Sequence, residues 1–195
     1  MRTYKLASAV LIAVLVSACT TSGEKGNPTP ASTPGSSSGN SAGSSLPARP
    51  SSLKLDSVDA CKLLNADQMK QLQAVATNPT TLDLVDGAKS PSCHYNGEDS
   101  FAYTIGAVTH NGVSYWLQGG NFDTKVIKVA DFGAVEVQLK GVSGFDCSVA
   151  IDVAEGQQLM VSYVPTSAKK PAQSVLCGNA EKAAGLALAT LKTLK

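Results

Sequence analysis

The sequence offers little that would support a chemical reaction. Only 2 of its 195 residues are histidines, aromatic residues make up 5%, and the formal net charge is +1. It contains neither a phosphate-binding loop nor a Gly-x-Gly-x-x-Gly dinucleotide fingerprint. Ser143, in Gly-Val-Ser-Gly, lacks the Gly-x-Ser-x-Gly spacing of a nucleophile elbow. We therefore assign no catalytic residue and no cofactor, and we predict that the protein is not an enzyme.

The apolar run near the N-terminus is too short to cross a membrane. Residues 6–16 are almost entirely apolar, but about eleven residues span only about half of a ~30 Å hydrocarbon core. The run follows Arg2 and Lys5 and leads to Val-Ser-Ala before Cys19, which is the layout of a secretory signal that ends in a lipobox. We expect residues 1–18 to be a lipoprotein signal peptide and Cys19 to be the lipidated N-terminus. An ordinary cleaved signal with an incidental Cys19 is the alternative.

A concentrated basic face is also missing. Proteins that bind nucleic acid need one, because they gain affinity by releasing counterions from the phosphates. Removal of residues 1–18 takes away Arg2 and Lys5 and leaves 14 basic and 15 acidic side chains, which are interspersed. The sequence therefore excludes nucleic acid as a partner.

The segment after Cys19 has the composition of a flexible tether. Residues 20–52 are mostly Ser, Thr, Gly and Pro, so they cannot bury enough apolar surface to offset the loss of backbone entropy. A coil of this length spans on the order of 30 Å. We expect residues 19–52 to be a lipidated, disordered tether and residues 53–195 to form a single globular domain.

The cysteines predict disulfides. Without Cys19, four of the five remain, and an even number is typical of an exported domain. Neighbouring cysteines are about thirty or more residues apart, unlike the close pairs of a zinc site, so we predict no metal site. Four cysteines allow three connectivities. We favour Cys61 with Cys93 and Cys147 with Cys177, because each pair would join the start of a helix to a strand that can lie beneath it.

Short helices are expected at the start of the domain. Asp59 is an acidic N-cap for a helical turn in which Leu63 and Leu64 face inward. A second helix is predicted from a capping box of Asn65 and Gln68, followed by apolar residues at helical spacing; these are Met69, Leu72 and Val75. Asn78-Pro79 is expected to end this helix.

From Ser92 the apolar period changes to two, which is typical of strands. We expect a hairpin of strands at 101–105 and 113–117, with Asn111-Gly112 as its type I′ turn. Further strands are expected at 135–139, 147–153 and 159–163.

The C-terminus is predicted to be one long helix from about Pro171 to Thr193, with an alanine-rich apolar stripe that allows close packing. Antiparallel strands bracketed by helices indicate an α+β fold, in which the long C-terminal helix and the short N-terminal helices pack on one face of an antiparallel sheet.

Several motifs in combination resemble a family of uncharacterised actinobacterial cell-envelope lipoproteins, which share a domain of unknown function with four extracytoplasmic cysteines. Besides the lipobox and tether, the resemblance depends on four segments: Asp59-Ala60-Cys61-Lys62-Leu63-Leu64, Cys93-His94-Tyr95, Phe145-Asp146-Cys147 and Leu176-Cys177. Tyr95 stands where that group often has tryptophan. The resemblance implies an outward-facing α+β lipoprotein and supplies no activity.

Trp116 is the candidate contact residue. Alternation along 113–117 places it with Ser114 on the face opposite Val113, where an exposed tryptophan could anchor a partner; a position in the core is the alternative. His94 and His110 each stand alone in the sequence, and we give neither a catalytic role.

Together these features predict a lipoprotein anchored to the cell membrane by the lipid on Cys19, on the extracytoplasmic face. We interpret its folded part as a non-enzymatic binding or accessory domain for an envelope protein or component, with the helix-poor sheet face or its loops as the contact. A small-ligand or lipid-binding lipoprotein is the alternative. It would require an apolar cavity between sheet and helix.

Overall fold

The computed structural model describes residues 46–85, 87–98, 100–166 and 170–194, so Cys19 and residues 1–18 lie outside the described residues. In chain order the elements are η1 (Ala60–Lys62), α1 (Ala66–Gln71), β1 (Ala74–Val85), β2 (Ala88–Gly97), β3 (Phe101–Val108), η2 (Val113–Gln118), β4 (Phe122–Val129), β5 (Phe132–Leu139), β6 (Cys147–Ala154), β7 (Gln157–Pro165) and α2 (Gln173–Thr193). None of the described helices combines the length and hydropathy that a membrane crossing requires.

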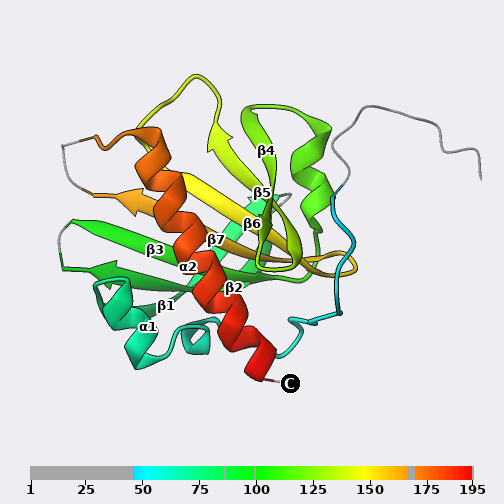
Figure 1. Cartoon of the computed structure of the whole chain (residues 1–195), viewed down its shortest axis with the longest axis horizontal. Helices are drawn as coiled ribbons and strands as arrows, with labels where there is room; N and C mark the ends of the chain where they lie inside the picture. The colour runs from blue at the N-terminus through cyan, green and yellow to red at the C-terminus, as the bar shows by residue number, and fades with distance from the viewer. Residues whose placement is uncertain (1–45, 86, 99, 167–169, 195) are drawn as a thin grey trace, which may run out of the picture. The chain divides into compact units, whose positions relative to one another are not determined.

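The strands form one seven-stranded antiparallel sheet in the order β1-β2-β3-β7-β6-β5-β4 (Figure 1). The sheet consists of two meanders, β1–β3 and β4–β7, which are connected through η2. They meet in the centre, where β3 pairs with β7 from Phe101↔Pro165 to Val108↔Gln158. The predicted α+β class is confirmed.

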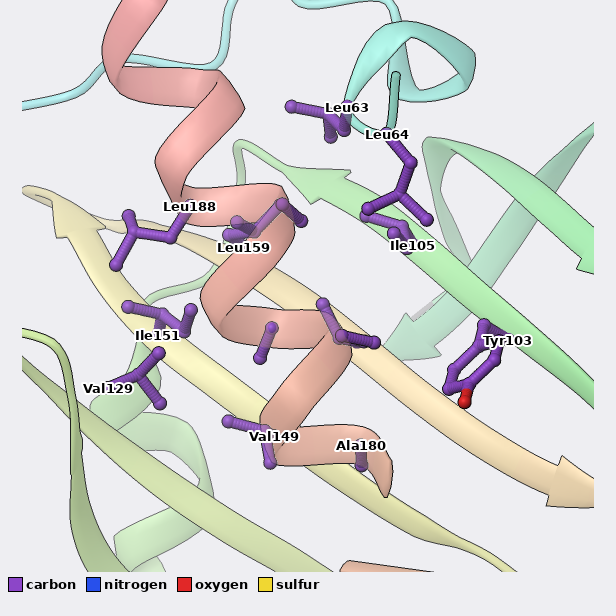
Figure 2. Packing of buried hydrophobic residues seen from close by; sticks show 14 of the residues in the cluster. Leu63, Leu64, Tyr103, Ile105, Val129, Val149, Ile151, Leu159, Ala180 and Leu188 are labelled. Atoms are coloured by element: carbon purple, nitrogen blue, oxygen red, sulfur yellow. The ribbon is translucent and has the colours of Figure 1, made fainter. Parts of the chain in front are cut away.

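The long helix α2 covers one face of the sheet, over β6 and β7 (Figures 1 and 2). Its buried residues recur every three or four positions, as predicted, and small alanines let the helix approach the strands closely. Opposite it, alternate residues of the strands point into the same core, including Val149, Ile151 and Leu159, all fully buried. The buried positions of α2 are Leu176, Cys177, Ala180, Ala183, Ala184, Ala187, Leu188 and Leu191.

The N-terminal helices begin as predicted, but the second one is shorter. Asp59 accepts a hydrogen bond from Cys61 N, and Asn65 and Gln68 form the expected capping box. Helix α1 ends at Gln71, however, because Gln73 adopts the left-handed conformation with φ 55° that commonly terminates a helix. The expectation that Val75 belongs to this helix and that Asn78-Pro79 ends it was wrong. Those residues lie in β1, where pairing with β2 overrides local helix propensity.

Two disulfides fasten the helical elements to the sheet, with the connectivity that we favoured. Cys61–Cys93 joins η1 to β2, and Cys147–Cys177 joins the start of β6 to α2. Beside the first disulfide, the fully buried Tyr95 donates from its hydroxyl to the carbonyl of Ala60 at 2.7 Å. Burial raises the pKa of Tyr95 to about 12, so the hydroxyl remains a donor.

Residues 113–118 form the 3₁₀ helix η2 and not the second strand of a hairpin. The strands beside β3 are β2 and β7. Helix η2 packs on the sheet face away from α2, where Val135, Ala150 and Met160 alternate with residues that face α2.

The exposed position considered for Trp116 as a contact residue is wrong, and the alternative, a position in the core, is correct. Trp116 is only 4% exposed and belongs to this second core. Its indole Nε1 donates to Gln158 Oε1 at 2.6 Å, and Gln158 Nε2 in turn donates to the carbonyl of Asn111. The tryptophan therefore holds η2 and the chain before it against the sheet.

Residues just before Leu53, the predicted start of the domain, contact the sheet. We call residues 46–52 the strap, because they lie against the sheet. Arg49 forms ion pairs with Asp152 (Nε to Oδ2, 3.0 Å) and Glu155 (Nη2 to Oε2, 2.8 Å). Pro47 lies so close to Gly133 that a Cβ added to Gly133 would be 3.0 Å from Pro47. The next residue after the strap, Leu53, donates from its N–H to Val153 O at 2.7 Å.

The burial of Trp116 predicts a large stability effect. We expect Trp116→Ala to lower the free energy of unfolding by about 3–5 kcal/mol, because it leaves a cavity and removes the donor to Gln158 Oε1. The neighbouring Leu117→Ala, at 37% exposure, is the control and should change it by less than about 1 kcal/mol. Urea denaturation of both variants measures the difference, and equal effects would contradict the position of Trp116 in the core.

Candidate functional site

Three of the exposed large apolar side chains in the described residues lie around the connection between β5 and β6. Phe145 is 56% exposed and Val142 40%, and Leu139 at the end of β5 is 37% exposed. We call residues 140–146 the pinned loop. Loops on the surface commonly carry small polar residues, so an exposed phenylalanine and valine in one short loop indicate a surface for contact with another molecule.

This loop is fixed to the rest of the domain at several points. The side chain of Gln173, the first residue of α2, accepts a hydrogen bond from Gly144 N through Oε1 and donates through Nε2 to Asp146 O, both at 2.8 Å. At the other end of the loop, Lys140 N donates to Asn121 O at 2.8 Å. The Cys147–Cys177 disulfide follows directly. Phe145 is therefore presented on backbone that is already ordered.

Gly144 is required for this arrangement. Its φ of +72° favours glycine, and a Cβ at this position would lie 3.0 Å from Lys170 Cβ and 3.2 Å from Pro171 O. The loop can thus lie directly on the segment that leads into α2. Any larger residue would push the loop away from α2 and loosen its bonds to Gln173.

The charges around the loop are few. Lys140 and Lys170 are exposed, while Asp146 is half-buried. Burial raises the pKa of Asp146 above the ordinary carboxyl value. The surface therefore offers apolar groups with basic flanks.

The pinned loop and the strap lie at opposite ends of β6. The loop precedes Cys147 at the start of the strand, whereas Arg49 of the strap pairs with Asp152 near its end (Figure 1). Strand residues advance about 3.4 Å each, so the two ends are roughly 20 Å apart. The pinned loop is therefore at the end of β6 that is far from the strap, where the chain enters the described part of the domain.

Both histidines lie at exposed positions, and they belong to different segments. On β2, His94 pairs with Thr104 across to β3, and His94 Nδ1 lies 2.8 Å from Thr104 Oγ1. His110 follows β3. Among the residues that the structure describes, neither histidine forms an ion pair with a carboxylate, so the arrangement of a general base with its orienting acid is not formed.

One group of residues has the element types of a metal site. A carboxylate oxygen of Glu136 and the sulfurs of Cys147 and Cys177 lie within 4.8 Å of one another. The two sulfurs are bonded to each other, however, and a metal would require free thiolates. The group is therefore a disulfide beside a carboxylate, and we assign no metal to it.

Sequence reasoning did not identify the pinned loop as a site. Phe145 entered only as part of a family motif, and Val142 was not singled out. The available signal was the placement of both apolar residues beside Gly141 and Gly144, in a segment with no strand periodicity. That pattern predicts a turn that exposes apolar side chains.

A comparison with protein families gives one match. Residues 14–190 match the profile of a family described as "Protein of unknown function (DUF3558)". Searches of curated proteins and of solved structures found no match.

The burial of Asp146 predicts a pH dependence. Because the pKa of the Asp146 carboxyl is raised in the folded state, the folded protein binds a proton at this carboxyl more tightly than the unfolded chain does. The wild type is therefore stabilised through this group as the pH falls, and loses that contribution as the pH rises. We expect Asp146→Asn to be more stable than wild type at about pH 7, with the difference shrinking towards about pH 4.

Urea denaturation across this pH range measures the difference. Asp123→Asn, at an exposed position of β4, is the control for general loss of one carboxylate. A difference between Asp146→Asn and wild type that stays constant with pH would contradict the burial effect.

Proposed function

From the premise that the chain belongs to the DUF3558 family of proteins of unknown function, we propose that it is an actinobacterial cell-envelope lipoprotein with a non-enzymatic binding domain. A lipid on Cys19 anchors it to the extracytoplasmic face of the membrane. Its folded domain contacts an envelope protein through the pinned loop.

Two features support the location. The sequence up to Cys19 has the order of basic, apolar and small residues that a lipoprotein signal requires. The domain also has two disulfides that bridge its helices to the sheet. Disulfides persist in oxidising compartments and are rare in the cytosol.

The exposure of Phe145 on a pinned backbone carries the binding proposal. Aromatic residues dominate the affinity of protein interfaces, because they bury a large apolar area with few rotatable bonds. Ordering a flexible loop on binding would cost conformational entropy. Here the bonds from Gln173 and the adjacent disulfide order the loop before any partner arrives.

The position of the strap supports an outward-facing contact. The strap holds the end of the tether at one end of β6, and the pinned loop is at the other. From its composition, the chain from Cys19 to the strap would span on the order of 30 Å as a flexible coil. The domain then stands off the bilayer and can present the loop to a partner.

The anchor has a direct test. We expect Cys19→Ala to release the protein from the membrane fraction into a soluble one, because a single acyl chain or none cannot hold a protein stably on a bilayer. Cell fractionation followed by immunoblotting measures this, and intact mass shows the lipid on the wild type. Membrane retention of the unlipidated variant would refute a lipid anchor on Cys19.

The contact through Phe145 is tested by photo-crosslinking on intact cells, with the crosslinking amino acid at position 142. We expect Phe145→Ser to lower the yield of the crosslinked partner at least about tenfold, the effect of removing an interface anchor. Leu194→Ser, which replaces a 50% exposed leucine at the other end of α2, is the matched control.

Thermal unfolding shows whether both variants keep the fold. An undiminished crosslink in Phe145→Ser would overturn the role of the pinned loop. Such a result would leave the lipid anchor on Cys19 unaffected, because the two are measured separately.

A further inference from the structure

The strand β1 has an unusually exposed first half. It is the terminal strand of the sheet and pairs with β2 along one edge only, and the described part of the chain places no strand along its other edge (Figure 1). Residues 75–79 are all exposed, on both faces of the strand. A strand in this state offers unpaired backbone N–H and C=O groups to an incoming segment.

A β-bulge turns an apolar side chain outward at the start of this strand. Ala74 pairs with Gly97 and Ala76 with Asn96, so Val75 is an extra residue between two ladder pairs. Bulges re-aim side chains in this way, and Val75 is 58% exposed, the highest value among the large apolar side chains of the described chain.

A surface groove of about 420 Å³ lies directly beside Val75, between the end of α1 and the start of β1. Lys70 and Glu98, which carry charges of opposite sign, line part of it, and its apolar lining comes from Ala66, Met69, Ala74 and Val75. Gln73 O accepts a hydrogen bond from Glu98 N at 3.1 Å, which fixes the backbone on both sides. The groove is large enough for an apolar side chain and its neighbours.

We propose that this groove and the β1 edge together bind an extended segment of a partner polypeptide. The segment adds a strand to the sheet beside β1 and places one apolar side chain against Met69 and Val75. Backbone hydrogen bonds supply affinity in this mode of recognition, and a pocket for a side chain supplies selectivity. The site is separate from the pinned loop, and the proposal does not depend on the function assigned to that loop.

Pro79 limits where the segment can pair. Pro79 lies opposite Cys93 on β2. Because proline has no N–H to donate to β2, the backbone groups of Pro79 must point away from β2, towards the free edge. Backbone groups alternate along a strand, so Thr77 also directs its N–H and C=O outward. The segment therefore pairs around Thr77, next to Val75, and cannot continue past Pro79 with a full ladder.

The opposite edge of the sheet differs in charge. On β4, Asp123, Lys125 and Lys128 are exposed, and charged side chains of this kind protect an edge from pairing. Between Ala74 and Thr81, β1 has no charged residue. An uncharged edge with an adjoining apolar groove thus distinguishes β1 as the docking strand.

The test uses the Cys19→Ala chain, labelled with ¹⁵N, and a blocked peptide of alternating threonine and valine that ends in lysine for solubility. We expect amide shifts concentrated at residues 74–78 and Glu98 on titration. The same peptide N-methylated at every interior amide should bind at least about tenfold more weakly, because it cannot form the ladder hydrogen bonds. Shifts centred elsewhere, or equal binding of the methylated peptide, would overturn the proposal.

Val75→Lys should weaken binding of the unmethylated peptide by about tenfold or more, because it removes the apolar contact and charges the edge. Val175→Lys, an exposed valine in the first turn of α2, is the matched control and should bind as the parent chain does. The unperturbed amides of each variant report that it is folded. A dimer of the chain that Val75→Lys abolishes, seen by light scattering, would overturn the proposal by identifying a second copy as the occupant.

Discussion

The pairing of β3 with β7 determines the continuity of the sheet and the positions of both cores. It joins strands that are about fifty or more residues apart in the chain. Without it, β3 and β7 would each have an unpaired edge, and the two meanders would not form one continuous sheet. It also fixes which residues of β7 face α2. Leu159 and Val161 point to the alanine stripe of the helix, while Gln158 and Met160 point to η2. Because these two faces are filled from opposite sides, the domain has two cores that share one sheet.

Local patterns predicted the elements whose own sequence decides their structure. The capping box at Asn65, the alternation along β6 and the apolar stripe of α2 all lie within a single element, and all were confirmed. The alternation at 113–117 failed, because a short run of alternating residues also fits a 3₁₀ turn whose Trp116 is buried by the sheet. Strand β1 was missed because, apart from Val75, its residues from Ala74 to Thr81 are small or polar and show no apolar alternation. Pairing with β2 holds them extended.

The candidate site was less predictable than the fold. Trp116 and Phe145 have comparable apolar content, but only the tertiary structure decides which one is covered. The sheet provides Gln158 as a partner for the indole, whereas Gly144 and Gln173 hold the pinned loop so that Phe145 stays outside. The strap was predicted to be part of the tether because its composition matches that of the tether. Its contacts depend on residues far along the chain, since Arg49 pairs with Asp152 and Glu155 and Pro47 lies against Gly133.

An exposed apolar side chain contributes more to binding when the backbone that carries it is already ordered than when that backbone is flexible. On a flexible segment, the free energy gained by burying Phe145 or Val75 against a partner would be offset by the loss of backbone freedom, which is about 1–2 kcal/mol per residue. Ladder pairs on both sides of the bulge hold Val75, and two side-chain bonds from Gln173 hold the pinned loop. Folding has already ordered both segments, so association loses little further backbone entropy and retains most of the gain from burial. The same core that determines the sheet therefore makes its two exposed apolar sites suitable for binding.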